Sequence, residues 1–194
     1  METFWFYIQM GLDHVLDLSA YDHILFLSAL AVPFTFRSWK KVLLLATVFT
    51  IAHCLSLALS AYKVLTVNVA LIEFLIPVTI LFTAAFDLFY ARKEFEQRRI
   101  APHLVATAFF GLIHGFGFSN YFKMLMAGEE RKLVPLLGFA TGIELSQILI
   151  IIGVLLLSYL AVSIVKIKKW IFVTIAAIAI ILIVLPMLAN TYPW

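Results

Sequence analysis

Residues 133–162 read LVPLLGFATGIELSQILIIIGVLLLSYLAV, a run in which Glu144 is the one charged side chain. A helix needs about 20 predominantly apolar residues to cross the hydrocarbon core of a bilayer. This run exceeds that minimum, so it predicts a transmembrane helix that is tilted or kinked. A soluble domain of this size could not bury so much apolar surface, and the stretch therefore decides the fold class.

Five other stretches between clusters of charged residues resemble this one, which gives six candidate spans at residues 22–36, 42–62, 64–90, 100–122, 133–162 and 171–189. The N-terminal stretch 2–19 is aromatic-rich and amphipathic, too polar for a clear span and too apolar for a free tail. We interpret it as an interfacial or re-entrant helix, with a seventh span as the alternative. The sequence thus predicts an all-α, polytopic transmembrane helix bundle, with residues 1–194 forming a single integral membrane domain.

The composition agrees with a protein whose solvent is the bilayer. Hydrophobic residues make up 64% of the chain and charged residues 13%, and the mean hydropathy is +1.06. Soluble domains are about 45–50% apolar and about 25% charged. The net charge of +3 does not indicate a nucleic-acid partner, because Lys and Arg of membrane proteins gather in cytoplasmic loops. Cys54 is the only cysteine, which excludes a disulfide framework and a cysteine-rich metal site.

The loops also predict the orientation in the cytoplasmic membrane. Ten of the 14 basic residues follow the first, third and fifth candidate spans, and the other four lie in loops on the opposite side. The positive-inside rule predicts that the side with these ten basic residues faces the cytoplasm. Both termini are therefore expected on the non-cytoplasmic side.

Acidic and histidine side chains occur inside these apolar stretches, although a charge at the centre of a bilayer costs at least ~2.5–3.5 kcal/mol. No Lys or Arg lies well inside a span, which argues against structural ion pairs. Carboxylate and imidazole groups are instead ligands that suit nickel, iron, zinc, manganese or copper, or members of a proton pathway. The candidates are Asp13, His14, Asp17, Asp22, His23, His53, Glu73, Asp87, His114 and Glu144.

Depth can be estimated from about 1.5 Å of rise per residue. His53, Glu73, His114 and Glu144 all fall between the midplane and the outer third of the membrane, so we expect them to share one site that opens outward. The residues expected near the outer interface are Asp13, His14, Asp22 and His23, and Asp17 shares a helix face with the first two. Asp87 falls near the cytoplasmic end and is expected only to reach the interface.

Glycines accompany two of these residues. Gly111-x-x-x-Gly115 and Gly138-x-x-x-Gly142 predict close helix packing beside His114 and Glu144. The run His114-Gly-Phe-Gly-Phe118 is poorly suited to a regular helix, and irregular backbone at membrane depth needs cover by protein or a water-filled cavity. These residues could also have structural roles. A lone histidine in an apolar helix is more often a hydrogen-bonded core residue than a metal ligand, and Asp22 could cap its helix.

These motifs resemble the HupE/UreJ family of small membrane proteins over nearly the whole chain and in the family's order. The matching segments are Gly11-Leu-Asp-His14, Tyr21-Asp-His-Ile-Leu-Phe-Leu27, Thr50-Ile-Ala-His-Cys-Leu-Ser-Leu57, Ile72-Glu-Phe-Leu-Ile76, His114-Gly-Phe-Gly-Phe118 and Gly142-Ile-Glu144. The resemblance implies a nickel permease or an accessory protein of hydrogenase and urease maturation, with maturation proteins as partners. It implies that the metal-handling residues are His14, Asp22, His23, His53, Glu73, His114 and Glu144.

Three functions are compatible with these residues. The first is a transition-metal permease, with nickel favoured and zinc, iron, copper or manganese also suited, in which Asp13, His14, Asp17, Asp22 and His23 capture the ion outside. The second is an intramembrane metalloenzyme that activates water, with Glu73 or Glu144 as the general base. The third is a metal-free, proton-coupled carrier or accessory subunit. The expected partners are membrane lipid and a metal ion, and no nucleic acid.

Overall fold

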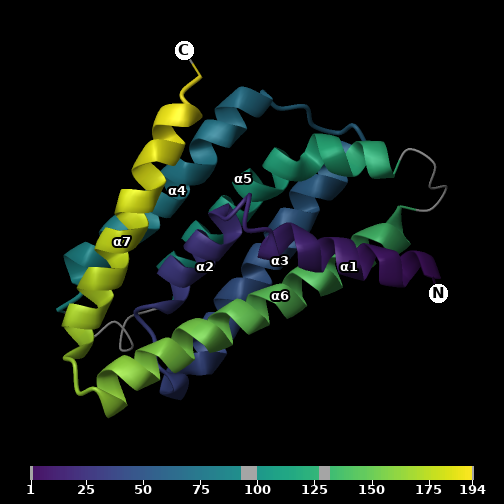
Figure 1. Cartoon of the computed structure of the whole chain (residues 1–194). Coiled ribbons are helices and arrows are strands. Elements are labelled where there is room, and N and C mark those ends of the chain that lie inside the picture. The colour runs from purple at the N-terminus through teal and green to yellow at the C-terminus, as the bar shows by residue number, and fades with distance from the viewer. Residues whose placement is uncertain (1, 93–99, 127–131, 194) are drawn as a thin grey trace.

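The computed structural model describes residues 2–92, 100–126 and 132–193. In this part of the chain every regular element is helical, which confirms the predicted all-α bundle (Figure 1). The helices are α1 (Glu2–Leu16), α2 (Asp22–Ala31), α3 (Trp39–Ala61), α4 (Val69–Tyr90), α5 (Ala101–Leu125), α6 (Leu133–Tyr159) and α7 (Lys169–Asn190). A 3-10 turn, η1 (Phe36–Ser38), leads into α3, and a π-helical turn, η3 (Leu160–Ile164), ends α6.

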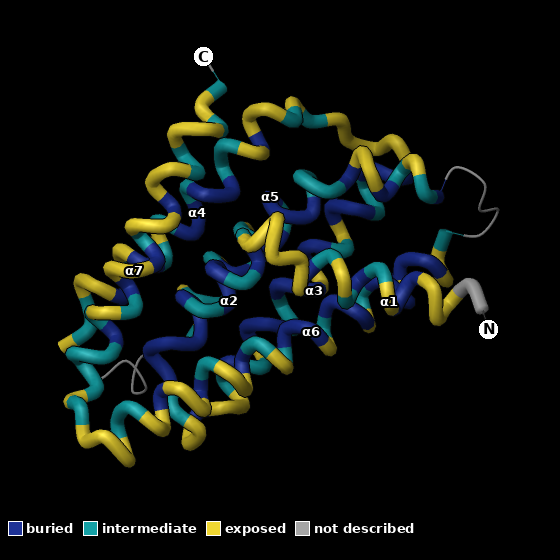
Figure 2. Tube along the Cα trace, in the orientation of Figure 1, coloured by how far each residue is buried: buried dark blue, intermediate teal, exposed yellow. Residues whose placement is uncertain are grey.

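Five of these helical segments are long and apolar enough to cross a membrane: Phe36–Ala61, Val69–Tyr90, Ala101–Leu125, Leu133–Ile164 and Lys169–Asn190. They correspond to the five candidate spans after the first. Figure 2 shows exposed positions along their outward faces. Many of the exposed residues are large and apolar, for example Leu149, Leu156 and Leu182. Such faces suit contact with lipid, and the chain is a multi-pass membrane protein.

The first candidate span, 22–36, is not one long helix. Helix α2 has 10 residues, so it rises only about 15 Å against a hydrocarbon thickness of about 30 Å. It stops at Ala31 because Pro33 follows, which has no backbone N–H to donate to the carbonyl oxygen four residues earlier. A prediction from hydropathy alone could not detect this break, since the residues beyond it remain apolar.

Helix α1 runs alongside α6 in the same direction. Gly138 of α6 lies against Phe4 and Tyr7, Gly142 lies against Ile8, and the Ser146 hydroxyl faces the carbonyl oxygen of Leu12 at 3.3 Å. This packing places α1 inside the bundle, starting at the same end as α6. Because the chain continues along α6 into α2, α1 does not turn back as a re-entrant helix would.

Helices α1 and α2 together follow the length of α6. Farther along α6, Tyr159 contacts Phe36, which comes just after α2, with ring centroids 6.3 Å apart. The two short helices therefore make one discontinuous crossing, with residues 17–21 as the break. Counted in this way, the bundle has six crossings.

Glycines set the closest helix contacts, as the two small-residue motifs predicted. A Cβ on Gly111 would come within 2.7 Å of the Phe49 carbonyl oxygen, and a Cβ on Gly115 would overlap the Ser56 hydroxyl. The expected irregular backbone after His114 is wrong, because α5 continues as a regular α-helix through Leu125. Gly115 serves the close approach of α3 rather than a break in α5.

Candidate metal centre

Four histidines from four different helices meet inside the bundle. His14 comes from α1, His23 from α2, His53 from α3 and His114 from α5. The ring centroid of His23 lies 4.6 Å from that of His14, 5.4 Å from that of His114 and 5.5 Å from that of His53. His23 is therefore the centre of the cluster, which we call the histidine cluster and which also includes its neighbour Asp22.

The donor atoms of this cluster fall into two overlapping triads. One triad is His14, His23 and His53, and the other is Asp22, His23 and His114; within each, the ligand atoms lie within 4.8 Å of one another. Imidazole nitrogens bind zinc-like ions at about 2.0–2.1 Å, which places two ligands of one ion about 3–4 Å apart. Small side-chain rotations would suffice to close either triad on an ion.

Several ring nitrogens in the cluster lack a hydrogen-bond partner within the described part of the chain. These buried atoms are Nε2 of His14, Nε2 of His23, Nδ1 of His114 and both nitrogens of His53. Buried polar atoms in proteins nearly always have a partner, whether protein or ordered water. Four converging histidines with open nitrogens are what a site for a metal ion requires, and a hydrogen-bonded core histidine does not fit this pattern.

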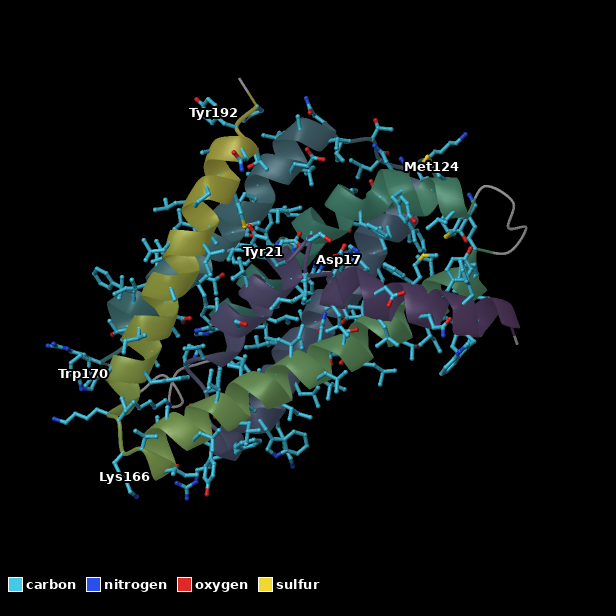
Figure 3. The ribbon with its side chains drawn as sticks, viewed as in Figure 1. Asp17, Tyr21, Met124, Lys166, Trp170 and Tyr192 are labelled. Carbon is cyan, nitrogen blue, oxygen red and sulfur yellow. The ribbon has the colours of Figure 1, made fainter. Side chains whose placement is uncertain are left out.

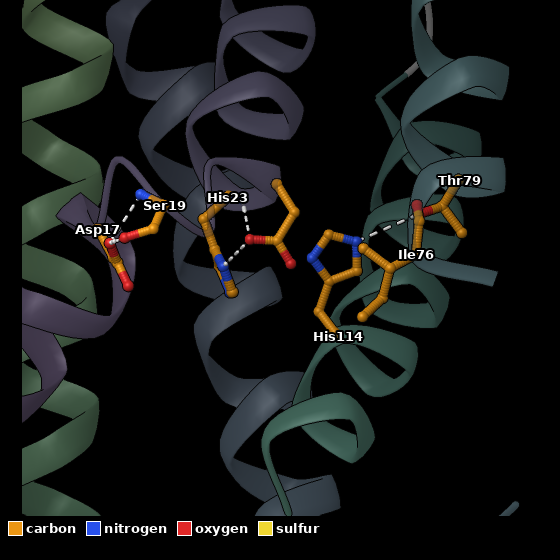
Figure 4. A network of polar contacts seen from close by, with 7 residues as sticks. Asp17, Ser19, His23, Ile76, Thr79 and His114 are labelled. Carbon is orange, nitrogen blue, oxygen red and sulfur yellow. Dashed lines mark hydrogen bonds and ion pairs between the residues drawn. The ribbon is translucent and has the colours of Figure 1, made fainter. Parts of the chain in front are cut away.

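Hydrogen bonds assign the tautomer of His114. The Thr79 hydroxyl lies 2.7 Å from the Ile76 carbonyl oxygen, to which it donates its one hydrogen, and 3.1 Å from Nε2 of His114 (Figure 4). Thr79 must therefore accept a hydrogen from Nε2. This leaves the lone pair of His114 on Nδ1, the nitrogen without a partner.

The same argument applies to His23. Its Nδ1 lies 3.1 Å from Oδ1 of Asp22, and the carboxylate also accepts the backbone N–H of His23 at 2.9 Å. Donation from Nδ1 to the carboxylate leaves the lone pair on Nε2. A carboxylate that fixes the tautomer of a histidine in this way is common around metal ligands.

Phenylalanine rings surround the cluster. Phe49 lies 5.2 Å from His114 and 5.8 Å from His53, Phe26 lies 5.3 Å from His114, and Phe118 lies 3.9 Å from His14 between ring centroids. Phe139 stacks on Phe118 at 5.4 Å. These aromatic rings form much of the wall around the histidines.

Two cavities flank the break between α1 and α2. The first has a volume of about 460 Å³ and is lined by Asp13, His14 and Asp17, among others. The second has a volume of about 310 Å³ and is lined by Asp22 and Glu73 together with the ends of α4 and α7. We call them the first and second vestibules; each contains one member of the histidine cluster.

The vestibules also contain three predicted ligands that do not join the cluster, Asp13, Asp17 and Glu73, all of which are exposed. Asp17 lies in the break, near the middle of the molecule (Figure 3). The hydroxyl and the backbone N–H of Ser19 donate to its Oδ1 at 2.6 and 2.8 Å, which fixes the position of this carboxylate within the break.

The comparison with protein families decides the relationship that the motifs implied. A family model described as HupE / UreJ protein matches residues 1–191. The chain belongs to the HupE/UreJ family. Comparisons with curated proteins and with solved structures found no match.

In this HupE/UreJ protein Glu144 lies away from the cluster, although the depth estimate grouped it with His53 and His114. Its carboxylate accepts hydrogen bonds from the hydroxyls of Thr47 at 2.6 Å and Thr50 at 2.7 Å, both on α3. Depth along a helix gives the height of a residue but not the direction of its side chain. Thr47 and Thr50 were not among the predicted site residues, although they precede His53 at three-residue spacing.

Asp87 also differs from its predicted position in the HupE/UreJ chain. It was expected to reach the cytoplasmic interface, but it is 3% exposed and its Oδ2 has no hydrogen-bond partner in the described residues. Thr79, which fixes the tautomer of His114, was not predicted either. A hydroxyl residue two positions after a proline in a span is too common a feature to mark it.

Proposed function

We propose that this protein is a membrane permease for a divalent transition-metal ion, with nickel as the favoured substrate. The observation that supports the proposal most directly is the convergence of four histidines with open, buried ring nitrogens on one point between α1, α2, α3 and α5. Imidazole and carboxylate suit nickel as well as zinc, iron and copper. Membership of the HupE/UreJ family favours nickel among these ions.

The two triads favour transport over permanent storage. A permeation site must bind an ion firmly enough to admit it and weakly enough to release it. Because His23 belongs to both triads, an ion can exchange His14 and His53 for Asp22 and His114 without leaving His23. Such an exchange replaces ligands one at a time and avoids an uncoordinated ion in the apolar interior.

The vestibules provide the approach to the cluster. Asp13 and Asp17 in the first vestibule, and Glu73 in the second, attract a hydrated cation before it meets a histidine. In this proposal the three exposed carboxylates capture the ion, while His14 and Asp22 receive it. In this proposal Asp13, Asp17 and Glu73 are therefore not ligands of the final site.

Metal content and metal flux test the proposal together. Purified protein is incubated with Ni²⁺, desalted and analysed for bound metal, and the same preparation is reconstituted into proteoliposomes for uptake. We expect wild type to hold and transport Ni²⁺, and His23→Gln to lose both. His103→Gln is the matched control, because His103 lies at the start of α5 beside Phe86, outside both triads.

The outcomes separate the competing functions. Bound metal without flux in wild type would contradict the permease and favour a metalloenzyme. Wild type that holds no metal and takes up none would contradict both metal-based functions. Equal losses in His23→Gln and His103→Gln would show that the assay reports folding rather than coordination.

A further inference from the structure

We propose that an anionic phospholipid binds in a groove between the start of α3 and the second half of α6, with an acyl chain in the groove and its phosphate beside Lys40. This lipid site is separate from the histidine cluster. The inference does not depend on the proposed permease function.

The groove has a volume of about 450 Å³ and is lined by aromatic and aliphatic side chains. One wall consists of Phe36, Trp39 and Leu43, which are three and four residues apart and therefore share one face of η1 and α3. The other wall consists of isoleucine and leucine side chains within residues 148–155 of α6. Ligand pockets in proteins are typically about 300–1,000 Å³, so the groove is large enough for a ligand.

The groove opens sideways, toward the hydrocarbon of the membrane. Its floor contains the buried side chains of Ile151 and Leu155, and its rim contains the exposed side chains of Phe36, Trp39 and Ile152. Both helices that form it belong to segments long and apolar enough to cross a membrane. An occupant that enters from this side is therefore a hydrocarbon chain.

The groove begins at one end of the bundle and extends inward. Phe36 starts the span that contains α3, and its ring contacts that of Tyr159 at the end of α6. From Phe36 to Leu43 the groove covers about 10 Å at about 1.5 Å per residue. Trp39 stands near the start of the span, where tryptophan commonly marks the membrane–water interface. The groove therefore has the direction of a lipid, with the headgroup at the surface and the chain below it.

Basic residues lie at the surface end of this groove. The segment that forms its first wall contains Arg37, Lys40 and Lys41. Nζ of Lys40 lies 5.8 Å from the ring centroid of Trp39, which places a positive charge directly beside a side chain of the wall. Residues 23–72 contain no acidic side chain. The positive charge is thus available to an anion such as a phosphate.

The combination of an apolar groove with basic residues favours an anionic lipid over other occupants. A zwitterionic lipid brings a cation of its own toward Lys40. A second copy of the chain, packed on this groove about a two-fold axis, would bring the same basic segments together. Basic pockets between transmembrane helices on the cytoplasmic side are typical sites for anionic headgroups, and the positive-inside rule predicts that this end faces the cytoplasm.

The fluorescence of Trp39 can report the bound lipid. The chain has four tryptophans, so replacing Trp5, Trp170 and Trp194 by Phe leaves Trp39 as the reporter. This protein is reconstituted into phosphatidylcholine vesicles that contain a minor fraction of phosphatidylglycerol. In one preparation the phosphatidylglycerol carries bromine on its acyl chains, and in the other the same mole fraction of phosphatidylcholine does. Bromine quenches tryptophan on contact, and both leaflets contain it, so the orientation of the protein does not matter.

We expect brominated phosphatidylglycerol to quench Trp39 more strongly, with an apparent preference of about five-fold, the effect of one lysine at an anionic lipid surface. Lys40→Gln should reduce this preference toward one, and Lys40→Arg should retain it. Lys168→Gln is the matched control, because Lys168 is exposed and lies just before α7, outside the groove. Comparing the two brominated lipids within each variant cancels any change that the loss of the ammonium causes in the emission of Trp39.

Three results would overturn the proposal. Equal quenching by the two brominated lipids in the parent protein would show that the groove does not select an anionic lipid. Quenching by neither lipid would show that protein covers the groove, either a second copy or another subunit. A preference that falls equally in Lys40→Gln and Lys168→Gln, or in neither of them, would show that no phosphate is held beside Lys40. Since no metal ion enters the measurement, failure of the permease function would leave each of these results unchanged.

Discussion

Thr79 illustrates how a single hydroxyl can control a metal ligand that lies on another helix. It donates to Ile76 on its own helix, so it can only accept from His114, and His114 must keep its hydrogen on Nε2. The lone pair on Nδ1 then faces the cluster. A hydrogen bond from the ring nitrogen that does not bind the metal orients the imidazole and makes the other nitrogen a stronger metal ligand.

Replacing Thr79 by Val should therefore weaken metal binding without removing a ligand. The valine is similar in shape but cannot accept from Nε2, so His114 can rotate or change tautomer. We expect Ni²⁺ affinity to fall by about 10- to 100-fold, the usual effect of losing such a partner. Titration calorimetry measures the change, and Thr83→Val is the control because the Thr83 hydroxyl bonds only within α4, to the Thr79 carbonyl oxygen. Equal affinity of wild type and Thr79→Val would show that the tautomer is not set by this bond.

At the scale of elements, the contact between α1 and α6 carries His14 to the cluster. A Cβ on Gly142 would overlap the Ile8 carbonyl oxygen and lie 2.9 Å from Gly11 Cα. The three nearest atoms all belong to the backbone of α1, which cannot rotate away as a flexible side chain could, so the helices must separate. His14, three residues beyond Gly11 on α1, would move with them.

Gly142→Ala should lower both thermal stability and metal content. Overpacking of this kind costs about 1–3 kcal/mol, and the four tryptophans provide a fluorescence signal for unfolding. Gly153→Ala on the same helix is the control, since nothing lies within 4 Å of a Cβ at that position. We expect Gly153→Ala to unfold at the wild-type temperature or slightly above it, because alanine is the better helix former. A Gly142→Ala protein as stable as Gly153→Ala would contradict the assigned packing.

The elements also show what the sequence could and could not predict. Long apolar runs such as residues 133–162 identify five of the crossings, because length and hydropathy are local properties. The first crossing is divided between α1 and α2, and neither helix is long enough to cross alone, so the candidate span 22–36 marks only the second half of that crossing. Their joint crossing depends on packing against α6, which no local pattern encodes.

The candidate site, too, could be predicted from the sequence only in part. Histidines such as His53 and His114 could be singled out from the sequence because polar groups are costly in the bilayer interior. Their meeting with His14 and His23 needed the break at residues 17–21, which turns two short helices toward α3 and α5. Glu144 shares the predicted depth but points to Thr47 and Thr50, since depth does not determine the direction of a side chain.

At the scale of the whole molecule, orientation decides the direction of transport. The connection 62–68 joins the ends of α3 and α4 at the end of the bundle where α1 enters, while Lys166 and Trp170 lie at the opposite end from Met124 and Tyr192 (Figure 3). Arg92 lies 4.8 Å over the Trp170 ring at the Lys166 end, so by the positive-inside rule we expect that end to face the cytoplasm. In this orientation both vestibules open outward.

Cysteine labelling in intact cells tests this orientation. In a Cys54→Ala background, which removes the only native thiol, Thr66→Cys lies in the connection between α3 and α4, and Lys168→Cys lies just before α7; both positions are exposed. We expect a membrane-impermeant maleimide to label Thr66→Cys in intact cells and Lys168→Cys only after permeabilisation. The reverse pattern would turn the carboxylates of both vestibules toward the cytoplasm. The same histidine cluster would then be approached from inside the cell, and the proposed route for uptake would become a route for efflux.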